Sequence, residues 1–209
     1  MKSIIKKNYY PKLKKIFDFT FSIILCIILA PLIFIISIYL FFIIGRPILF
    51  KQVRSGQNRK KISIIKFRTM TVEKKINYGP KDDKRRIIKK VQFLRRFRLD
   101  ELPQLFNILK GDISFVGPRP LLPEYNRLFS NYHIKRLSVP SGLTGWSQIN
   151  AHSCKSWNSR LDLDVWYVNN CNFFLDLKII YLTLIFFLKK IFTKTKRKNF
   201  FYKKFNGKN

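Results

Sequence analysis

The sequence predicts an α-rich α+β protein that a long N-terminal helix attaches to a membrane. Three observations lead to this prediction. No charged residue occurs from Phe19 to Ile44, although the whole chain has a formal net charge of +31. Apolar residues recur at helical spacing in several later segments, whereas only residues 62–67 have the composition of a strand. We therefore expect a re-entrant N-terminal membrane helix, interfacial amphipathic helices and a small cytoplasmic domain.

The composition points to anionic partners and a reducing compartment. Lysine and arginine number 42 against 11 acids, an excess that favours nucleic acid, acidic lipid or phosphorylated substrates. The chain is also rich in Ile, Phe, Asn and Tyr, so AT-rich coding is an alternative source of part of this charge. The three cysteines have no metal or redox spacing and only two histidines occur, which argues for free thiols and against zinc.

The uncharged run near the N-terminus is too long for a signal peptide, and its length alone would allow it to span a membrane. However, Pro31 stands near its middle and should bend or break the helix. Basic residues also flank both ends, so the positive-inside rule finds no asymmetry. We predict that residues 16–45 enter the membrane, break at Pro31 and return to the cytoplasmic side. A kinked spanning helix is the alternative.

Residues 62–67 predict a short strand that ends in two cations. Lys66 and Arg68 are two positions apart, so both should project from one face, as a pair of phosphate contacts would. A solvated strand edge is the alternative. From Asp83 the spacing predicts a basic amphipathic helix at the membrane interface. Its apolar face would comprise Ile87, Ile88, Val91, Leu94 and Phe97.

The pair Asp100 and Glu101 is unusual in a chain with so few acids. Pro103 fits a helix only in its first turn, so both acids should lie at a helix start, and Gly111 is a plausible stop. The buried face of this helix would comprise Leu102, Leu105, Phe106 and Leu109. A carboxylate there, near bound phosphate, could be a nucleophile, a Mg²⁺ ligand or both. A plain helix N-cap at Asp100 is the alternative.

Two loops rich in glycine and proline follow the acid pair. In residues 115–120, Arg119 is the only side chain able to bind an anion. Pro123 then opens a short helix. Residues 140–146 form a second loop, whose glycines would let the backbone approach a ligand closely, unless they simply make a turn.

Two further helices complete the predicted fold. The first covers residues 157–168, with Asp162 and Asp164 free to pair with cations. Its apolar side would comprise Trp157, Leu161, Val165 and Val168. The second lies within residues 173–192, where the uncharged part is too short to span a bilayer, so we expect it to lie in the interface or pack on the body. The tail after residue 192 is basic, which suits contact with anionic lipid.

Several strings in one order resemble a single family, the monotopic bacterial phosphoglycosyl transferases, also called bacterial sugar transferases. They are RPILFKQ at residues 46–52, KFRTM at 66–70, LDELPQL at 99–105, NILKG at 107–111, VGPRP at 116–120 and GLTG at 142–145. The match covers essentially the whole chain. Residues 204–209 also resemble the tail of a small member that begins bacterial N-glycosylation with a UDP-bacillosamine derivative.

The resemblance implies a specific reaction. A UDP-sugar, with an N-acetylated sugar expected, would donate its sugar phosphate to undecaprenyl phosphate and release UMP, as the first membrane step of glycoconjugate assembly. Asp100 would be the nucleophile that forms a covalent phosphosugar intermediate, and Asp100 and Glu101 would hold Mg²⁺. The residues expected to bind substrate phosphate are Lys66, Arg68, Arg95, Arg119 and His152.

The chain departs from the family pattern at two places. The membrane break is usually Ser-Pro, and here it is Ala30-Pro31. The family also has an arginine where this chain has His152, and a neutral imidazole binds an anion more weakly. The second departure leaves open an inactive relative that binds polyprenol phosphate or a glycan-assembly partner. A membrane-tethered nucleic-acid binder is a third reading, supported by charge alone, since no usual nucleic-acid-binding module occurs.

The resemblance also implies a division of the chain and its surroundings. We expect a basic segment at 1–15, the re-entrant helix at 16–45, a catalytic domain with interfacial helices at 46–192 and a basic tail at 193–209. The protein would be monotopic on the cytoplasmic face of the inner membrane. Its partners would be the two substrates and anionic lipid, without nucleic acid, and with a homodimer or downstream glycosyltransferases as further candidates.

Overall fold

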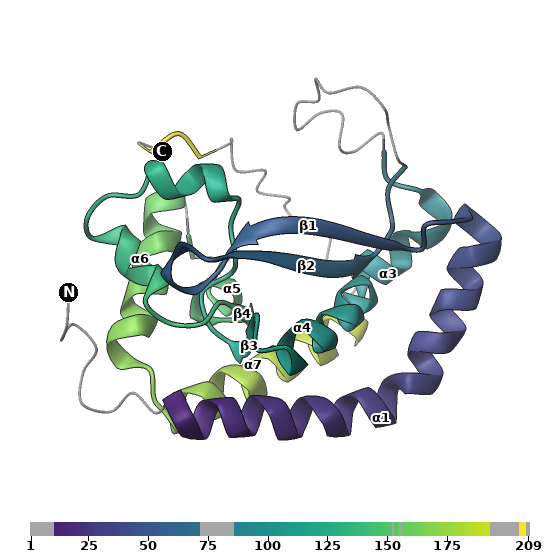
Figure 1. Ribbon diagram of the computed structural model, residues 1–209, viewed down its shortest axis with the longest axis horizontal. Coiled ribbons are helices and arrows are strands. Elements are labelled where there is room, and N and C mark those ends of the chain that lie inside the picture. Colours follow the sequence, from purple (N-terminus) through teal and green to yellow (C-terminus); the bar gives the residue numbers. More distant parts are fainter. Residues whose placement is uncertain (1–10, 72–85, 152, 155, 193–204, 208–209) are drawn as a thin grey trace.

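The computed structural model describes residues 11–71, 86–151, 153–154, 156–192 and 205–207. Helical segments dominate it, and the two small sheets have two strands each, which confirms the α-rich α+β class (Figure 1). The α-helices are α1 (Pro11–Ile44), α3 (Gln92–Arg96), α4 (Leu105–Leu109), α5 (Trp146–Ile149), α6 (Trp157–Asn170) and α7 (Phe173–Phe192). The strands are β1 (Leu49–Ser55), β2 (Lys61–Phe67), β3 (Ser114–Val116) and β4 (Gly142–Thr144). The 3-10 helices are η1 (Gln57–Arg59), η2 (Lys89–Val91), η3 (Leu99–Gln104), η4 (Pro123–Arg127) and η5 (His133–Leu137).

Helix α1 is one helix of 34 residues that contains Pro31. It runs along one side of the body and then turns sharply toward the β1–β2 hairpin (Figure 1). A proline removes one intrahelical hydrogen bond and clashes with the preceding turn, so a bend in this region has a physical cause. Among the described residues, α1 is the one helix long and apolar enough to cross a membrane.

The first half of α1 is fixed to the body by polar side chains at helical spacing. Lys14, Asp18 and Ser22 lie on one face and are all buried. The ammonium group of Lys14 pairs with the carboxylate of Asp176 on α7, and Asp18 Oδ1 accepts a 3.2 Å hydrogen bond from the amide of Phe115. The opposite side of this half is apolar and exposed.

The second half of α1 packs on a different part of the same body. Ile36 and Leu40 are buried against Phe67 of β2, Val91 of η2 and Leu94 of α3. Both halves of the bent helix therefore contact one continuous domain.

The predicted strand at residues 62–67 is confirmed as β2, which pairs with β1 in an antiparallel hairpin. Its register sets Phe50 opposite Lys66 and Arg54 opposite Ile62. Opposite residues in an antiparallel pair lie on one face of the sheet. Ile62 on that face is buried, so the face that carries Lys66 and Arg54 points toward the core of the domain.

The second glycine-rich loop contains a strand that the sequence did not predict. Strand β4 pairs in parallel with β3, and Gly142 and Gly117 meet at close range. A Cβ on Gly142 would lie 2.1 Å from the amide nitrogen of Gly117. The glycines therefore let two backbones approach each other, an arrangement that neither the ligand contact nor the plain turn considered from the sequence describes.

Two details of the predicted helices are wrong. The described part of the basic amphipathic segment is helical only from Lys89, because Ile87 forms a bridge with Met70 and Ile88 is extended. Phe106 is 46% exposed, while its neighbour Asn107 is buried and bonds to β2. Asn107, which bonds to backbone groups, is therefore inside, whereas Phe106, which helical spacing predicted to be buried, is exposed.

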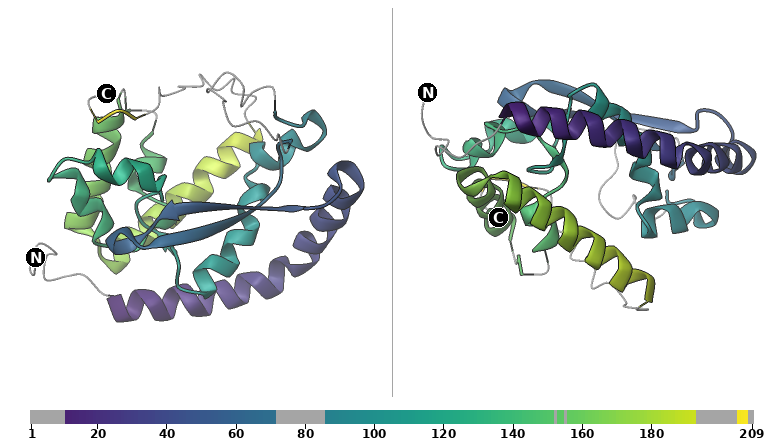
Figure 2. Two further views of the ribbon diagram at one scale, coloured as in Figure 1. Left: turned by 45° about the horizontal axis from the view of Figure 1, so that its top comes forward. Right: turned by 90° about the horizontal axis from the view of Figure 1, so that it is seen from below.

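The two long C-terminal helices are confirmed, except that Asp164, which was expected away from the apolar side, is buried and pairs with Arg136. Helix α6 buries Leu161, Val165 and Val168. Helix α7 buries Ile179 at 0% exposure yet leaves Phe174 80% exposed. Figure 2 shows α1 and α7 close together at one end and diverging toward the other. The three cysteines, Cys26, Cys154 and Cys171, are free, as expected.

Candidate active site

The acid pair lies in the first turn of η3, as the sequence predicts. Arg98, which precedes it, has φ 55°, a left-handed conformation that turns the chain sharply into the helix. Arg98 occupies the N-cap position, so Asp100 does not cap this helix. At the far end, α4 ends at Leu109, shortly before Gly111. Gly111 has a φ of 72°, and its backbone N–H donates a hydrogen bond to Ile108 O, which closes the last turn.

Three basic side chains converge on Glu101. Its Oε1 lies 2.6 Å from Lys66 Nζ and 3.2 Å from Arg119 Nη2, and its Oε2 lies 3.4 Å from Arg98 Nη1. Burial raises the pKa of Glu101, but Arg119, Lys66 and Arg98 together hold that pKa well below its ordinary value. Glu101 is therefore a fixed negative charge that joins η3, β2 and the Arg119 loop.

Asp100 has a different environment. Burial and the adjacent charge of Glu101 raise the pKa of its carboxyl, while Lys66 and Arg95 oppose that rise. Within the described part of the chain, no other residue donates a hydrogen bond to the Asp100 carboxylate. Its oxygens are thus available to a substrate, beside two cations that favour a phosphate group.

A buried network holds the Arg119 loop in place. Arg136 donates from Nη2 to the main-chain oxygen of Arg119 at 2.6 Å and from Nε to Asp164 Oδ2 at 2.9 Å. Ser147 Oγ donates to the other Asp164 oxygen at 2.5 Å. Arg136 and Asp164 are almost fully buried, so this network is rigid support for Arg119.

Asn107 fixes strand β2 beside the acid pair. Its Oδ1 accepts from the amide of Ile65 at 3.0 Å, and its Nδ2 donates to Ser63 O at 2.7 Å. The amide side chain thereby continues the sheet hydrogen bonding from the edge of β2 to helix α4. Because Asn107 fixes this part of β2, the next residue, Lys66, is held in contact with Glu101.

The other predicted site residues are placed as follows. Arg68 Nη2 donates to the backbone oxygens of Ile44 and Gly45 at 2.5 and 3.0 Å, so its guanidinium lies on the C-terminal end of α1. Arg95 is exposed and acts on Asp100 through its charge. Pro31 lies within α1. His152 falls outside the described residues.

Several residues at the site were not predicted to belong to it: Arg54, Arg98, Arg136 and Asp164. Arg54 shares a sheet face with Lys66 only through the register of the hairpin, which the sequence does not give. Nothing in the sequence links Arg136 to Asp164, which are 28 positions apart and meet only through packing of η5 on α6.

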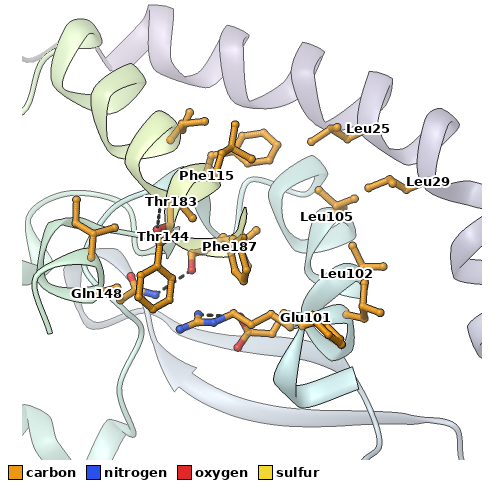
Figure 3. Close-up of a pocket in the computed structure, with 18 of the residues that line it drawn as sticks. Leu25, Leu29, Glu101, Leu102, Leu105, Phe115, Thr144, Gln148, Thr183 and Phe187 are labelled. Carbon is orange, nitrogen blue, oxygen red and sulfur yellow. Dashed lines mark hydrogen bonds and ion pairs between the residues drawn. The ribbon is translucent and has the colours of Figure 1, made fainter. Parts of the chain in front are cut away.

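An apolar cavity opens beside the acid pair, between the diverging helices α1 and α7 (Figure 3). Its volume is about 370 Å³. Leu25 and Leu29 line it from α1, Leu102 and Leu105 from η3 and α4, and Phe187 from α7 (Figure 3). At its polar edge lie Glu101 and Arg98, and the Arg98 guanidinium sits 5.9 Å from the centre of the Phe187 ring. A hydrocarbon chain with an anionic end suits this arrangement.

The two adjacent carboxylates of the acid pair are the residues that could hold a metal ion together with a substrate. The described residues contain no cluster of three or more metal-binding side chains. Mg²⁺, however, is commonly held by one or two carboxylates together with substrate phosphates and water. The adjacent carboxylates of Asp100 and Glu101 provide such a donor set, with Asp100 the less engaged of the two.

Comparison with known proteins gives a consistent result. A family model described as "Bacterial sugar transferase" matches residues 9–190. The chain is 46% identical to the "Uncharacterized sugar transferase EpsL" of Bacillus subtilis over 82% of this chain and 85% of that protein. It is 35% identical to the "UDP-glucose:undecaprenyl-phosphate glucose-1-phosphate transferase" of Klebsiella pneumoniae over 82% of this chain. That match covers 39% of the Klebsiella protein, so the chain spans well under half of its length. A similar partial match, 28% identical over 87% of this chain and 45% of the relative, is to the "UDP-N-acetylgalactosamine-undecaprenyl-phosphate N-acetylgalactosaminephosphotransferase" of Aeromonas hydrophila.

Proposed function

This chain belongs to the bacterial sugar transferase family, and we propose that it transfers a sugar phosphate from a UDP-sugar to undecaprenyl phosphate. The observation that carries the proposal is the position of Asp100. This carboxylate accepts no hydrogen bond from another described residue. It lies next to Glu101 and the three basic side chains that contact Glu101, and it is close to the apolar cavity. A nucleophile, charge compensation for phosphate and room for a lipid chain are what such a transfer needs.

In the proposed first step, a carboxylate oxygen of Asp100 attacks the sugar-linked phosphorus of the donor. A new P–O bond forms to Asp100, and the P–O bond to the nucleotide phosphate breaks, so UMP leaves with the bonding electron pair. Lys66 and Arg119 compensate the charge that develops on the phosphate oxygens. Glu101 keeps both cations in place through its ionised carboxylate.

In the second step, an oxygen of undecaprenyl phosphate attacks the same phosphorus, and the bond to Asp100 breaks. The products are polyprenyl diphosphate sugar and the free carboxylate. The cavity beside Glu101 would hold the first part of the polyprenyl chain, and Arg98 at its edge would face the lipid phosphate. Mg²⁺, held by Asp100 and Glu101, would supply further charge compensation for the diphosphate.

We propose that α1 is re-entrant and that the protein is monotopic on the cytoplasmic face of the inner membrane. The contacts of α1 support this topology. Lys14 and Asp18, near one end, and Ile36 and Leu40, near the other, all pack on the same domain. A helix that crossed the bilayer would hold its ends about 30 Å or more apart on opposite sides. The exposed apolar face of α7 and the net charge of +31 suit an interface with anionic lipid.

The donor sugar is proposed from the relatives and from the end of the chain. Some relatives are named for glucose and one for N-acetylgalactosamine, so the relatives alone leave the sugar open. The resemblance of residues 204–209 to the tail of a family member that uses an N-acetylated sugar leads us to propose an N-acetylated UDP-sugar. A homodimer or a downstream glycosyltransferase would be a partner in glycoconjugate assembly.

The test is UMP release from a panel of UDP-sugars with undecaprenyl phosphate and Mg²⁺. Wild type should release UMP with at least one sugar, and Asp100→Asn should release none. Asp162→Asn, which removes an exposed acid that pairs with His133 and contacts no proposed catalytic residue, is the matched control and should behave as wild type. Absence of release with every sugar, followed by release from His152→Arg, would instead show that this chain is an inactive relative.

A further inference from the structure

Two arginines lie together beyond the acid pair. Arg54 projects from the inward face of the β1–β2 hairpin, the same face that carries Lys66. Arg119 approaches from its loop and reaches Glu101. The amide of Ser55, the residue after Arg54, donates to Leu121 O at 2.8 Å, so the end of β1 lies against the segment that follows Arg119, and the Arg119 charge acts on Arg54. Like charges repel, and Glu101 offsets only the Arg119 side of the pair, so an anion that bound between the two arginines would stabilise the arrangement.

Local contacts hold Arg54 in this position. Its Nη2 donates to Gln52 Oε1 at 2.6 Å, and Gln52 is on the same face of the strand. The next residue, Ser55, donates its amide to Leu121 O at 2.8 Å, which ties β1 to the loop that follows Arg119. No carboxylate of the described residues forms an ion pair with Arg54. Burial first, and then the Arg119 charge, lower the pKa of Arg54 to about 10, which leaves it charged at neutral pH.

Lys66, Arg119 and Arg54 form a series of positive charges that begins at the acid pair. Lys66 and Arg119 share one oxygen of Glu101, at 2.6 and 3.2 Å, and Arg54 lies beside Arg119. A diphosphate carries its charge on two linked phosphate groups. One phosphate next to Asp100 would face Lys66 and Arg119, and the second would then face Arg119 and Arg54.

The apolar cavity distinguishes the two substrates. Its lining includes Arg98 and Glu101 but neither Arg54 nor Arg119. Arg54 instead lies at the end of β1 that contacts Leu121, just before η4. The lipid phosphate therefore suits the Arg98 side, and the water-soluble nucleotide suits the Arg54 side.

We propose that Arg54 and Arg119 bind the nucleotide-side phosphate of the diphosphate donor, the phosphate that leaves as the nucleoside monophosphate. Gln52 orients the Arg54 guanidinium for this contact. The proposal rests on the proposed function and adds a binding site for the leaving group.

The experiment compares wild type, Arg54→Gln, Arg54→Lys and Lys51→Gln. Lys51 is exposed on the opposite face of the same strand, so its variant controls for loss of one positive charge. The KM for the UDP-sugar and the KM for undecaprenyl phosphate are measured separately. Binding of UDP and UMP is measured on the same variants by calorimetry, which needs no turnover.

Arg54→Gln should raise the donor KM and weaken UDP binding by about tenfold or more, because charged hydrogen bonds to phosphate are lost. Arg54→Lys should be intermediate, since lysine keeps the charge but not the fork of donors. The acceptor KM should not change, and Lys51→Gln should match wild type. A rise in the acceptor KM alone, or unchanged UDP binding in both Arg54 variants, would overturn the proposal. An inactive wild type that still binds UDP through Arg54 would refute the proposed function and leave this site standing.

Discussion

Lys66 Nζ lies 2.6 Å from Glu101 Oε1, so the shortest ion pair among the described residues of the site belongs to the second acid of the pair. The carboxylate of Asp100, one residue earlier, forms no such ion pair with any residue that the structure describes. The two acids therefore have different roles that their adjacency in sequence does not reveal. Glu101 organises the cations, and Asp100 is the carboxylate that we propose as the nucleophile.

The first prediction concerns Glu101 and pH. Because its folded pKa is depressed, the stability it contributes is present above the unfolded value of 4.5 and is lost as pH falls below that value. Glu101→Gln should lower stability at pH 7 by about 3 kcal/mol, since three cations lose their common partner. Thermal unfolding from pH 7 to pH 3 should show a smaller pH dependence for this variant. If the Tm of Glu101→Gln depended on pH as strongly as the Tm of wild type, the depressed pKa of Glu101 would be contradicted.

The second prediction concerns the stability of the Asp100 variant. Burial raises the pKa of Asp100, so the folded state favours its protonated form, and stability falls as pH rises above its ordinary value of 3.8. Asp100→Asn removes a buried charge and should raise the Tm at pH 7, while activity is lost. Asp162→Asn serves as the exposed control. A lower Tm for Asp100→Asn would show that its charge is stabilised in the folded protein.

The third prediction concerns the support of Arg119. Arg136→Lys keeps the positive charge but cannot bond to both Arg119 O and Asp164 with the same geometry. We expect a donor KM at least several-fold higher. Asp164→Ala should destabilise the fold by about 3–5 kcal/mol, because it leaves Arg136 buried and unpaired. Lys135→Gln, the neighbouring substitution, should change neither quantity. Wild-type donor KM in Arg136→Lys would refute the positioning role.

The fourth prediction concerns the topology of α1. Single cysteines replacing Lys12 and Arg46 would be exposed at the two ends of the helix. In a background without the three native cysteines, a membrane-impermeant thiol reagent should label both from the cytoplasmic side only. Labelling of the two positions from opposite sides of the membrane would reject the re-entrant helix.

Much of the fold could be predicted because single segments specify it. Periodicity in α6 and the position of Gly111 after α4 depend on local sequence, and both are confirmed. The site was predicted only in part. The roles of Arg136 and Asn107 depend on partners far away in sequence, and the pairing of Gly117 with Gly142 depends on close packing of two loops. Spacing also misplaced Phe106, since it cannot detect that Asn107 satisfies backbone groups of β2.

The central claim, that Asp100 carries the sugar phosphate, is tested most directly without the acceptor. The purified protein is incubated with its UDP-sugar and Mg²⁺ but no undecaprenyl phosphate, and UMP and intact protein mass are measured. We predict release of about one equivalent of UMP and a mass gain of one sugar phosphate on the peptide that contains Asp100, with neither in Asp100→Asn. UMP release that requires the acceptor, together with an unmodified Asp100 peptide, would contradict the account and indicate direct transfer between the two substrates.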